Sequence, residues 1–459
     1  MASYRGVALI LVIVVIAVAT QPALAARPNI LFILSDDHRW DGLAAASNPK
    51  IITPSLDRLA RTGVHFVQAT MHVPQCTPAR AQLLTGLSPH QSGWYSNQYQ
   101  RADVRRTDGF NRYAMLPQLL RKGGYQTVFT GKWHLRPDPW NCGFSDVRTW
   151  MPGGGGPYRN PELARGNSRQ TQTVEGFTQQ VFADDVIDFL ESPAVRRAPF
   201  FAWVAFTAPH DPFQPNPADI QALYADKTAE QLFPPGFTGS GQVRNWHNYY
   251  EAITMLDRQV GRILDALERQ KLDGETIIVF SGDNGFMMGN RGWDGKVLPY
   301  EDSIRVPLII RAPGVAKFQG PTDACASSLD LPPTLLRLAG LSVPGNWPGR
   351  DLRPSLQNQT NHSIDHAFTE WADNASKRFG AHACRVIRTT QHKLIRWEDP
   401  ARGEELYDLE KDPRETSNRI DDSALQSIRK KLRHRLDAWM KRTSDPFGKG
   451  RLVGVEVER

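Results

Sequence analysis

The 459-residue chain has 40% hydrophobic and 22% charged residues, which excludes a disordered protein and indicates a folded globular one. Its formal charge of +7 comes from 55 basic and 48 acidic residues without a dense Lys/Arg tract, so we expect no nucleic-acid partner. The length exceeds what one compact core usually holds, which predicts one large and one smaller domain.

Residues 1–25 have the order of a secretory signal peptide. Arg5 precedes an apolar run from Val7 to Ala19, and the segment ends in Ala23-Leu24-Ala25, a small-residue cleavage site. The apolar run is shorter than the roughly 20 residues of a spanning helix, which disfavours the alternative of an uncleaved anchor. We therefore predict no stable membrane span and a secreted or periplasmic protein, which in a eukaryote would be lysosomal or extracellular.

Short apolar runs alternate with segments of helical spacing as far as about residue 345. The first run, residues 30–34, is followed by the polar Ser35-Asp36-Asp37, as in a strand buried on both faces. Further strands are predicted at residues 127–130, 200–206, 276–280 and 306–310, and helices at 54–62, 116–122, 182–191 and 249–270. This alternation predicts an α/β domain over residues 26–350, with a large, mostly parallel or mixed sheet sandwiched by helices.

The sequence changes character after residue 345. Residues 345–361 are rich in Pro, Gly and Asn and predict a linker. Strand-like segments at 384–389, 393–396 and 406–408 precede an amphipathic helix from about 423 to 441. We therefore predict a small C-terminal α+β domain over residues 351–459, with a small antiparallel sheet and a closing helix.

Two further features carry little chemistry by themselves. The glycine-rich residues 152–157 predict a mobile loop, and because this loop lacks the Lys and Ser/Thr of a phosphate-binding turn we assign it no chemical role. The four cysteines, at positions 76, 142, 325 and 384, are too few and too far apart for a disulfide framework. If Cys76 is consumed chemically, at most one bridge can form among the other three.

Polar residues follow four of the predicted strands: Asp36-Asp37, Gly131–His134, His210 and Asp283-Asn284. Ligands of α/β sheets bind beyond the carboxyl ends of the strands, so we expect these side chains to meet there. Three carboxylates and an amide form an all-oxygen set, which suits Ca²⁺ or Mg²⁺ rather than zinc.

Basic and histidine side chains accompany this predicted metal site. Lys132 and His134 lie two residues apart, so an extended chain would project both to the same side. With His210 and Lys296 they could neutralise a doubly charged oxyanion and move its protons.

The motif Cys76-Thr77-Pro78-Ala79-Arg80 is followed by Leu83-Leu84-Thr85-Gly86. Cys76 beside Arg80 could be a thiolate nucleophile, but a buried structural cysteine fits the isolated pattern as well.

Taken together, these motifs resemble the type I, formylglycine-dependent sulfatases of the alkaline phosphatase superfamily. Cys76-x-Pro78-x-Arg80 is similar to the signature in which that family oxidises the cysteine to formylglycine, although Ala79 stands where the family usually has serine. Residues 29–37, 131–134, 280–285, 300–307 and 405–413 are similar to its other motifs, in the same order.

The resemblance implies a sulfuric ester hydrolase with these site residues. The implied catalytic residues are Cys76, Arg80, Lys132, His134, His210 and Lys296. The implied ligands of Ca²⁺, or of Mg²⁺ in its place, are Asp36, Asp37, Cys76, Asp283 and Asn284.

The implied mechanism begins with a hydrated formylglycine at position 76, of which one hydroxyl attacks sulfur. Arg80 holds this hydrate, and Asp283 is a base as well as a metal ligand. His210 protonates the leaving alcohol while the two lysines hold the sulfate. His134 takes the proton of the second hydroxyl, so that sulfate leaves and the aldehyde re-forms. The implied partners are a formylglycine-generating enzyme during maturation and a sulfated glycan or small molecule as substrate, with aryl sulfates as artificial ones.

Two alternatives stay open at this stage. A phosphonate monoester or phosphodiester hydrolase of the same superfamily would share the metal site. From another class, a secreted carbohydrate-binding protein could carry a decayed site. A zinc phosphatase is disfavoured because the additional histidines that it needs are not found.

Overall fold

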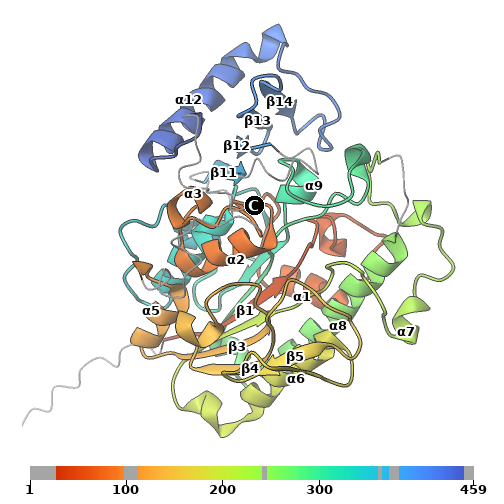
Figure 1. The fold of residues 1–459 in the computed structure, drawn as a ribbon, viewed down its shortest axis with the longest axis vertical. Helices are drawn as coiled ribbons and strands as arrows, with labels where there is room; N and C mark the ends of the chain where they lie inside the picture. The colour runs from red at the N-terminus through yellow and green to blue at the C-terminus, as the bar shows by residue number, and fades with distance from the viewer. Residues whose placement is uncertain (1–26, 98–111, 240–244, 360–363, 372–381, 449–459) are drawn as a thin grey trace, which may run out of the picture.

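The computed structural model describes residues 27–97, 112–239, 245–359, 364–371 and 382–448 (Figure 1). These residues form a 10-stranded sheet and a 4-stranded sheet, with helices around the larger one. The predicted signal peptide lies outside the described residues. Within them, no helix is both long and apolar enough to cross a membrane.

The large sheet is mixed, with parallel strands at its centre. Its strands, in spatial order, are β10 (Gly320–Thr322), β2 (Val64–Phe66), β9 (Leu308–Arg311), β8 (Thr276–Gly282), β1 (Asn29–Ser35), β7 (Phe200–Ala205), β3 (Gln126–Lys132), β4 (Asp146–Met151), β5 (Glu162–Arg165) and β6 (Thr171–Thr173).

The strands β8, β1, β7 and β3 are consecutive parallel neighbours. They are the four predicted strands that polar residues follow, so the register brings those residues to one edge. Ser35 pairs with Gly282, and Leu34 pairs with Ala205, which in turn pairs with Gly131. The run at 306–310 instead forms β9, which is antiparallel to β8 and starts only at Leu308.

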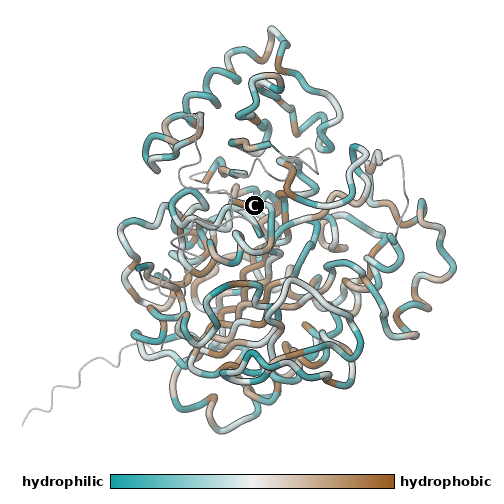
Figure 2. The backbone as a smooth tube through the Cα atoms, viewed as in Figure 1, coloured by the Kyte–Doolittle hydropathy of each residue, from teal (hydrophilic) through white to brown (hydrophobic). Residues whose placement is uncertain are grey.

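Side chains alternate between the two faces of the sheet because successive residues of a strand point to opposite sides. On β1, Ile30, Phe32 and Leu34 join one buried cluster, whereas Leu31 and Ile33 join another. The first cluster is covered by α2 (Cys76–Thr85), α5 (Leu116–Lys122) and α10 (Leu331–Leu338), and the second by α1 (Pro54–Thr62), α6 (Thr178–Glu191) and α8 (Trp246–Arg269). Helices on both faces confirm the predicted sandwich, and hydrophobic segments concentrate where the strands lie (Figure 2).

The predicted helices are all present, two of them longer at their starts. α6 begins at Thr178 and α8 at Trp246, a few residues before the positions that periodicity indicated. Among the described residues, the sequence did not reveal α2 and α10, nor the shorter helices α3 (Pro89–Ser92), α7 (Ala218–Gln221), α9 (Glu301–Ile304) and α11 (Arg353–Gln357). The last of these lies inside the predicted linker, and Arg350 there pairs with Asp330, so this segment is structured.

The small antiparallel sheet has the order β11 (His366–Trp371), β12 (Cys384–Thr389), β13 (His392–Trp397) and β14 (Glu404–Asp408). The closing helix α12 (Gln426–Arg442) packs Leu432, Leu436 and Trp439 against this sheet (Figure 1). The predicted antiparallel sheet and helix are thus confirmed. The four cysteines are all buried, free thiols.

Candidate active site

The four polar strand ends meet as the sequence predicts. Asp36 and Asp37 follow β1, and the backbone N–H of Asp37 donates to Asp283 Oδ1 over 3.3 Å, beyond the end of β8. Asn284 Nδ2 lies 2.6 Å from Asp37 Oδ1. His210, in the loop after β7, has its Nε2 3.8 Å from Asp37 Oδ2. The three aspartates and Asn284 are fully buried, so the charges of the aspartates interact with little solvent screening.

Cys76 is the first residue of α2, whose ten residues are all buried. Arg80 lies one helical turn later, and residues four apart share a helix face, which is the physical reason for the Cys-x-x-x-Arg spacing. From that face Arg80 Nε donates to Asp283 Oδ2 over 3.0 Å and Nη1 donates to the carbonyl of Lys132 over 2.6 Å. The arginine thus joins the helix to the ends of β8 and β3. The sequence did not predict a helix at this motif.

Two lysines reach the same point from different elements. Lys296 Nζ lies 2.8 Å from Cys76 Sγ and 2.5 Å from Asp37 Oδ1. Lys132, at the end of β3, forms a buried ion pair with Asp36, whose Oδ1 is 3.4 Å from Cys76 Sγ. A group at position 76 is therefore surrounded by both carboxylates and ammonium groups.

The donor set fits a hard cation. One ligand atom from each of Asp36, Asp37, Cys76 and Asp283 lies within 4.8 Å of the other three. Ligands at 2.3–2.6 Å from Ca²⁺ can lie at most about 5 Å apart, so these atoms could share one ion. Asp37 Oδ2 and Asn284 Oδ1 are buried and have no hydrogen-bond partner among the described residues, which is costly unless a ligand satisfies them.

The backbone at His134 is not extended, contrary to our prediction for residues 132–134. Strand β3 ends at Lys132, and His134 has a φ of 57°, in the left-handed region. The chain therefore turns between the two residues, so the two-residue spacing does not set where His134 points. The residue is partly exposed, but its Nδ1 is buried and has no hydrogen-bond partner among the described residues.

Burial dominates the electrostatics of the thiol. It raises the pKa of Cys76 to about 12, and the neighbouring Asp36 carboxylate contributes in the same direction. Burial also opposes the charge of Asp36, but Lys132, His210 and Arg80 outweigh it and lower the pKa of that carboxyl. An unmodified Cys76 is thus a neutral thiol at neutral pH, which disfavours the thiolate alternative because the thiolate is the nucleophilic form.

The histidines are neutral in this arrangement. Burial lowers the pKa of His134 to about 2, and Lys132 adds to the effect. Burial and Lys132 also lower the pKa of His210, while the aspartates oppose them. Each neutral imidazole has a nitrogen that can accept a proton.

The glycine-rich loop after β4 also belongs to this site, contrary to our expectation. A Cβ built on Gly154 would lie 2.6 Å from the Nε2 of His134, and one on Gly155 would lie 3.3 Å from the Nδ1 of His210. The run of glycines was the only sequence signal, and it does not reveal what the loop contacts. Sequence reasoning also missed Tyr249, whose hydroxyl donates to the carbonyl of Asp37 over 2.8 Å.

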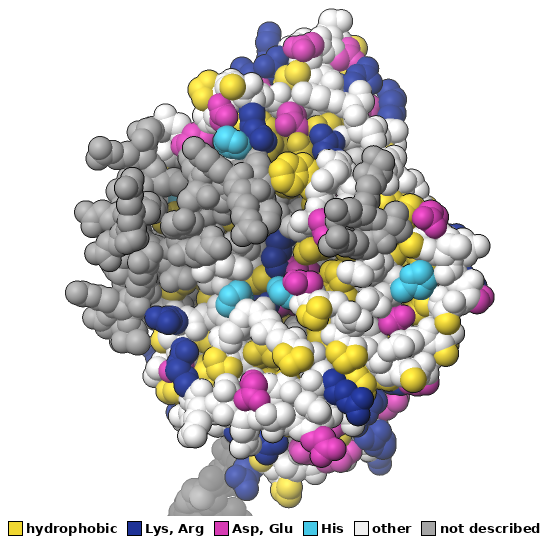
Figure 3. Space-filling model, turned by 45° about the vertical axis from the view of Figure 1, so that its right-hand side comes forward, with side chains coloured by type: hydrophobic (Ala, Val, Ile, Leu, Met, Phe, Trp, Pro, Cys, Tyr) yellow, Lys and Arg dark blue, Asp and Glu magenta, His cyan; other side chains and the backbone are white. Residues whose placement is uncertain are grey.

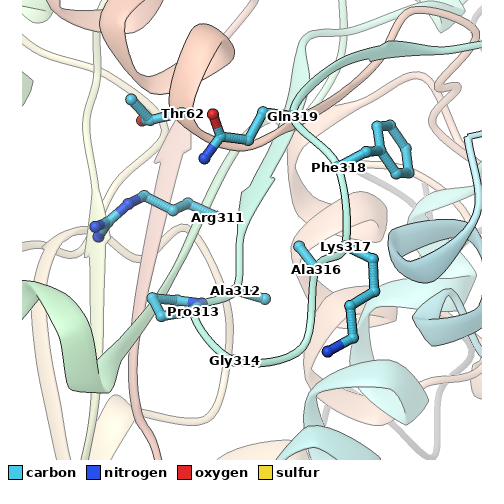
Figure 4. Close-up of a pocket in the computed structure, with 9 residues that line it drawn as sticks. All are labelled: Thr62, Arg311, Ala312, Pro313, Gly314, Ala316, Lys317, Phe318 and Gln319. Carbon is cyan, nitrogen blue, oxygen red and sulfur yellow. The ribbon is translucent and has the colours of Figure 1, made fainter.

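The molecular surface is consistent with this placement. Histidine, basic and acidic side chains gather near the centre of one face (Figure 3). A separate pocket of about 480 Å³ includes Arg311, which pairs with Ile278 near the start of β8, so this pocket lies at the opposite edge of the sheet (Figure 4). Its lining contains no carboxylate and no predicted site residue: Thr62, Arg311, Ala312, Pro313, Gly314, Ala316, Lys317, Phe318 and Gln319.

The fold and the site together define an enzyme with an α/β fold, whose lysines and arginine suit an oxyanion and whose oxygen donors suit a cation. Comparison with known proteins agrees. The Sulfatase family profile matches residues 28–341, and a profile described as "N-sulphoglucosamine sulphohydrolase, C-terminal" matches residues 289–442. The chain belongs to the sulfatase family of the alkaline phosphatase superfamily and is a sulfuric ester hydrolase.

Individual relatives cover most of the chain. An N-acetylglucosamine-6-O-sulfatase of Bacteroides thetaiotaomicron is 26% identical over 91% of this chain and 87% of its own. Among solved structures, BT4656 in complex with its substrate D-glucosamine-2-N,6-O-disulfate has a TM-score of 0.78 at 24% identity, covering 93% of this chain and 100% of its own. A phosphonate monoester hydrolase of Agrobacterium radiobacter has a TM-score of 0.68 at 26% identity, covering 92% and 97%.

Proposed function

We propose that this chain hydrolyses the sulfate esters of a carbohydrate, with a formylglycine formed from Cys76 and a bound Ca²⁺. The observation that carries the proposal is the set of charged groups around Cys76, the first residue of α2. Its Sγ contacts the carboxylate of Asp36 and the ammonium group of Lys296. The thiol is fully buried and neutral, so it needs chemical conversion before it can serve as a nucleophile. A formylglycine at this position would supply geminal hydroxyls, one to attack sulfur and one whose loss of a proton releases sulfate.

The cation would be held by Asp36, Asp37, Asp283 and Asn284 together with the converted side chain at position 76. All these donors are then oxygens, which favours Ca²⁺ or Mg²⁺ over zinc. Bound there, the cation would lower the pKa of a hydroxyl and neutralise sulfate oxygens.

The remaining side chains supply charge and protons. Lys132 and Lys296 offer ammonium groups to the sulfate oxygens, and Arg80 holds the group at position 76 from one turn along α2. We assign protonation of the leaving alcohol to His210, whose imidazolium form a bound anionic substrate would stabilise, and removal of the second hydroxyl's proton to His134, whose imidazole is neutral.

We base the proposed substrate class on the name of a similar sulfatase. The Bacteroides sulfatase acts on N-acetylglucosamine 6-O-sulfate by its name, and it is similar to this chain over most of both lengths. We propose that the substrate is a sulfated glycan or a smaller sulfated sugar. The enzyme would act on it outside the cytoplasm, after cleavage of residues 1–25. Maturation would require a formylglycine-generating enzyme. The division into domains at about residue 350 is part of the same proposal.

One specific observation supports a second candidate. The phosphonate monoester hydrolase from Agrobacterium radiobacter shares the fold with 26% identity, so a phosphonate or phosphodiester could be the better substrate.

The test is hydrolysis by protein coexpressed with a formylglycine-generating enzyme. An aryl sulfate and an aryl phosphodiester are compared with Ca²⁺ and with chelator, beside Cys76→Ala. We expect calcium-dependent sulfate release that the variant loses. Faster phosphodiester cleavage would favour the second candidate, and retained activity in Cys76→Ala would refute the assigned nucleophile.

A further inference from the structure

The loop between β4 and Tyr158 is attached at both ends to the segments that carry the two site histidines. At its start, the carbonyl of Met151 accepts a hydrogen bond from the backbone N–H of Trp133 over 2.9 Å. At its end, the buried Tyr158 hydroxyl donates to the carbonyl of His210 over 2.7 Å. The loop therefore spans from the chain beside His134 to the chain beside His210.

The bare backbone of this loop lies directly on both imidazole rings. A Cβ on Gly154 would lie 2.6 Å from both Cε1 and Nε2 of His134, closer than real Cβ contacts. A Cβ on the next residue, Gly155, would lie 3.3 Å from Cε1 and Nδ1 of His210, which is tight. By contrast, a Cβ on Gly153 would meet nothing within 4 Å.

None of these three glycines has a φ in the left-handed region. Alanine can therefore adopt the same backbone at each of them, and only the space around the new methyl group differs. Lys132, Lys296 and Asp36 lie near enough to both imidazoles to influence their pKa values, so displacing a ring would also change these charge interactions.

We propose that Gly154 and Gly155 are positioning residues: without side chains, their backbone holds the imidazoles of His134 and His210 in the orientations that the two proton transfers need. The inference rests on the proposed function for the roles of the histidines, whereas the contacts themselves do not depend on it. The two glycines act on different steps, because Gly154 contacts the histidine assigned to sulfate release and Gly155 the histidine assigned to the leaving alcohol.

The two steps can be separated by the leaving group. A nitrophenyl sulfate releases an anion that is stable without a proton, whereas a sugar sulfate releases an alkoxide that needs one. We expect Gly154→Ala to lower kcat for both esters similarly, by about 100-fold, with little change in KM, since a displacement of about 1 Å can have that effect. We expect Gly155→Ala to lower kcat for the sugar sulfate by roughly tenfold and for the nitrophenyl ester by less, because its contact is looser.

The experiment measures kcat and KM of the matured holoenzyme for both esters in Gly153→Ala, Gly154→Ala and Gly155→Ala. Imidazole ¹H–¹⁵N spectra are recorded in parallel, with the ring of His134 assigned from His134→Gln. Gly153→Ala should match the wild type, and the His134 resonances should move only in Gly154→Ala. A loss in Gly153→Ala equal to that in Gly154→Ala, or unmoved ring resonances in Gly154→Ala, would overturn the proposal. If the wild type cleaves neither sulfate, the proposed function fails, while the ring spectra still decide whether Gly154 positions His134.

Discussion

The ammonium group of Lys296 lies 2.8 Å from the Sγ of Cys76, although 220 residues separate them in the chain. The same Nζ contacts Asp37, so one lysine connects position 76 with one of the proposed metal ligands. Burial opposes its charge, but the Asp37 carboxylate outweighs this and raises the pKa of Lys296 well above its usual range. The lysine is therefore a permanent cation beside position 76, where we propose that it binds the sulfate oxygens.

Replacing Lys296 with alanine should remove this charge from the reacting group. We expect kcat/KM for an aryl sulfate to fall by about 10²–10³-fold, the loss typical of removing one preorganised charge donor. Steady-state kinetics would be compared with Lys317→Ala, which truncates an exposed lysine at the remote pocket. Wild-type activity in Lys296→Ala would contradict the assigned role.

Calcium should stabilise the fold because it would satisfy Asp37 Oδ2 and Asn284 Oδ1, which are buried and have no hydrogen-bond partner among the described residues. At a free concentration of 100 Kd, a ligand specific for the folded state adds about 2.7 kcal/mol, which a thermal melt detects. We expect Ca²⁺ to raise Tm, and chelator or Asp283→Asn to abolish the rise. In Asp219→Asn, which alters an exposed pair with Arg258, the rise should persist. An equal rise in Asp283→Asn would place the ion elsewhere.

Gly131 allows β3 and β7 to approach closely beside the site. Its φ is +111°, and a Cβ there would lie 2.0 Å from the carbonyl oxygen of Ala205. Gly131→Ala should therefore lower the free energy of unfolding by about 3 kcal/mol or more, from backbone strain and steric overlap together. Denaturant unfolding would measure the loss. In Gly274→Ala, where the new methyl group meets nothing within 4 Å, we expect a change within about 0.5 kcal/mol.

A buried ionic cluster joins α3 to the small sheet. His90 Nδ1 lies 2.6 Å from Glu370 Oε2, and its Nε2 lies 3.2 Å from the carbonyl oxygen of Thr443. Both ring nitrogens thus face acceptors, which favours the imidazolium. Arg385 and Asp445 pair with each other beside this histidine.

This cluster should make stability depend on pH. Burial opposes the charge of His90, but Glu370 outweighs it and raises the pKa above the ordinary 6.5. Because the pKa of His90 is higher in the folded than in the unfolded state, its protonation stabilises the fold. This contribution is complete below about pH 6.5 and is lost as the pH rises through the pKa of the folded state. We expect the free energy of unfolding to fall over that range in the wild type, and the fall to be smaller in His90→Gln. An unchanged fall in His90→Gln, or an equal reduction in the exposed His434→Gln, would contradict this explanation.

Much of this architecture could be predicted from local sequence. Continuous apolar runs such as residues 30–34 identify strands buried on both faces, and their alternation with helical segments predicts helices on both sides of a sheet. The polar residues after four of these strands then predict the edge at which the site lies, because parallel strands align their carboxyl ends. The family signature around Cys76 indicated the chemistry, and the roles of the individual site residues remain predictions.

Contacts between distant segments were decided only by the tertiary structure. The antiparallel direction of β9, the turn that reorients His134, and the packing of Gly154 and Gly155 on the two imidazoles have no signature within a short window. Local propensity reports the conformation of neighbouring residues, whereas register and side-chain contact depend on how the whole chain packs. The sequence by itself therefore determined which residues could form the site, and packing decided their geometry and the part that the glycine loop plays in it.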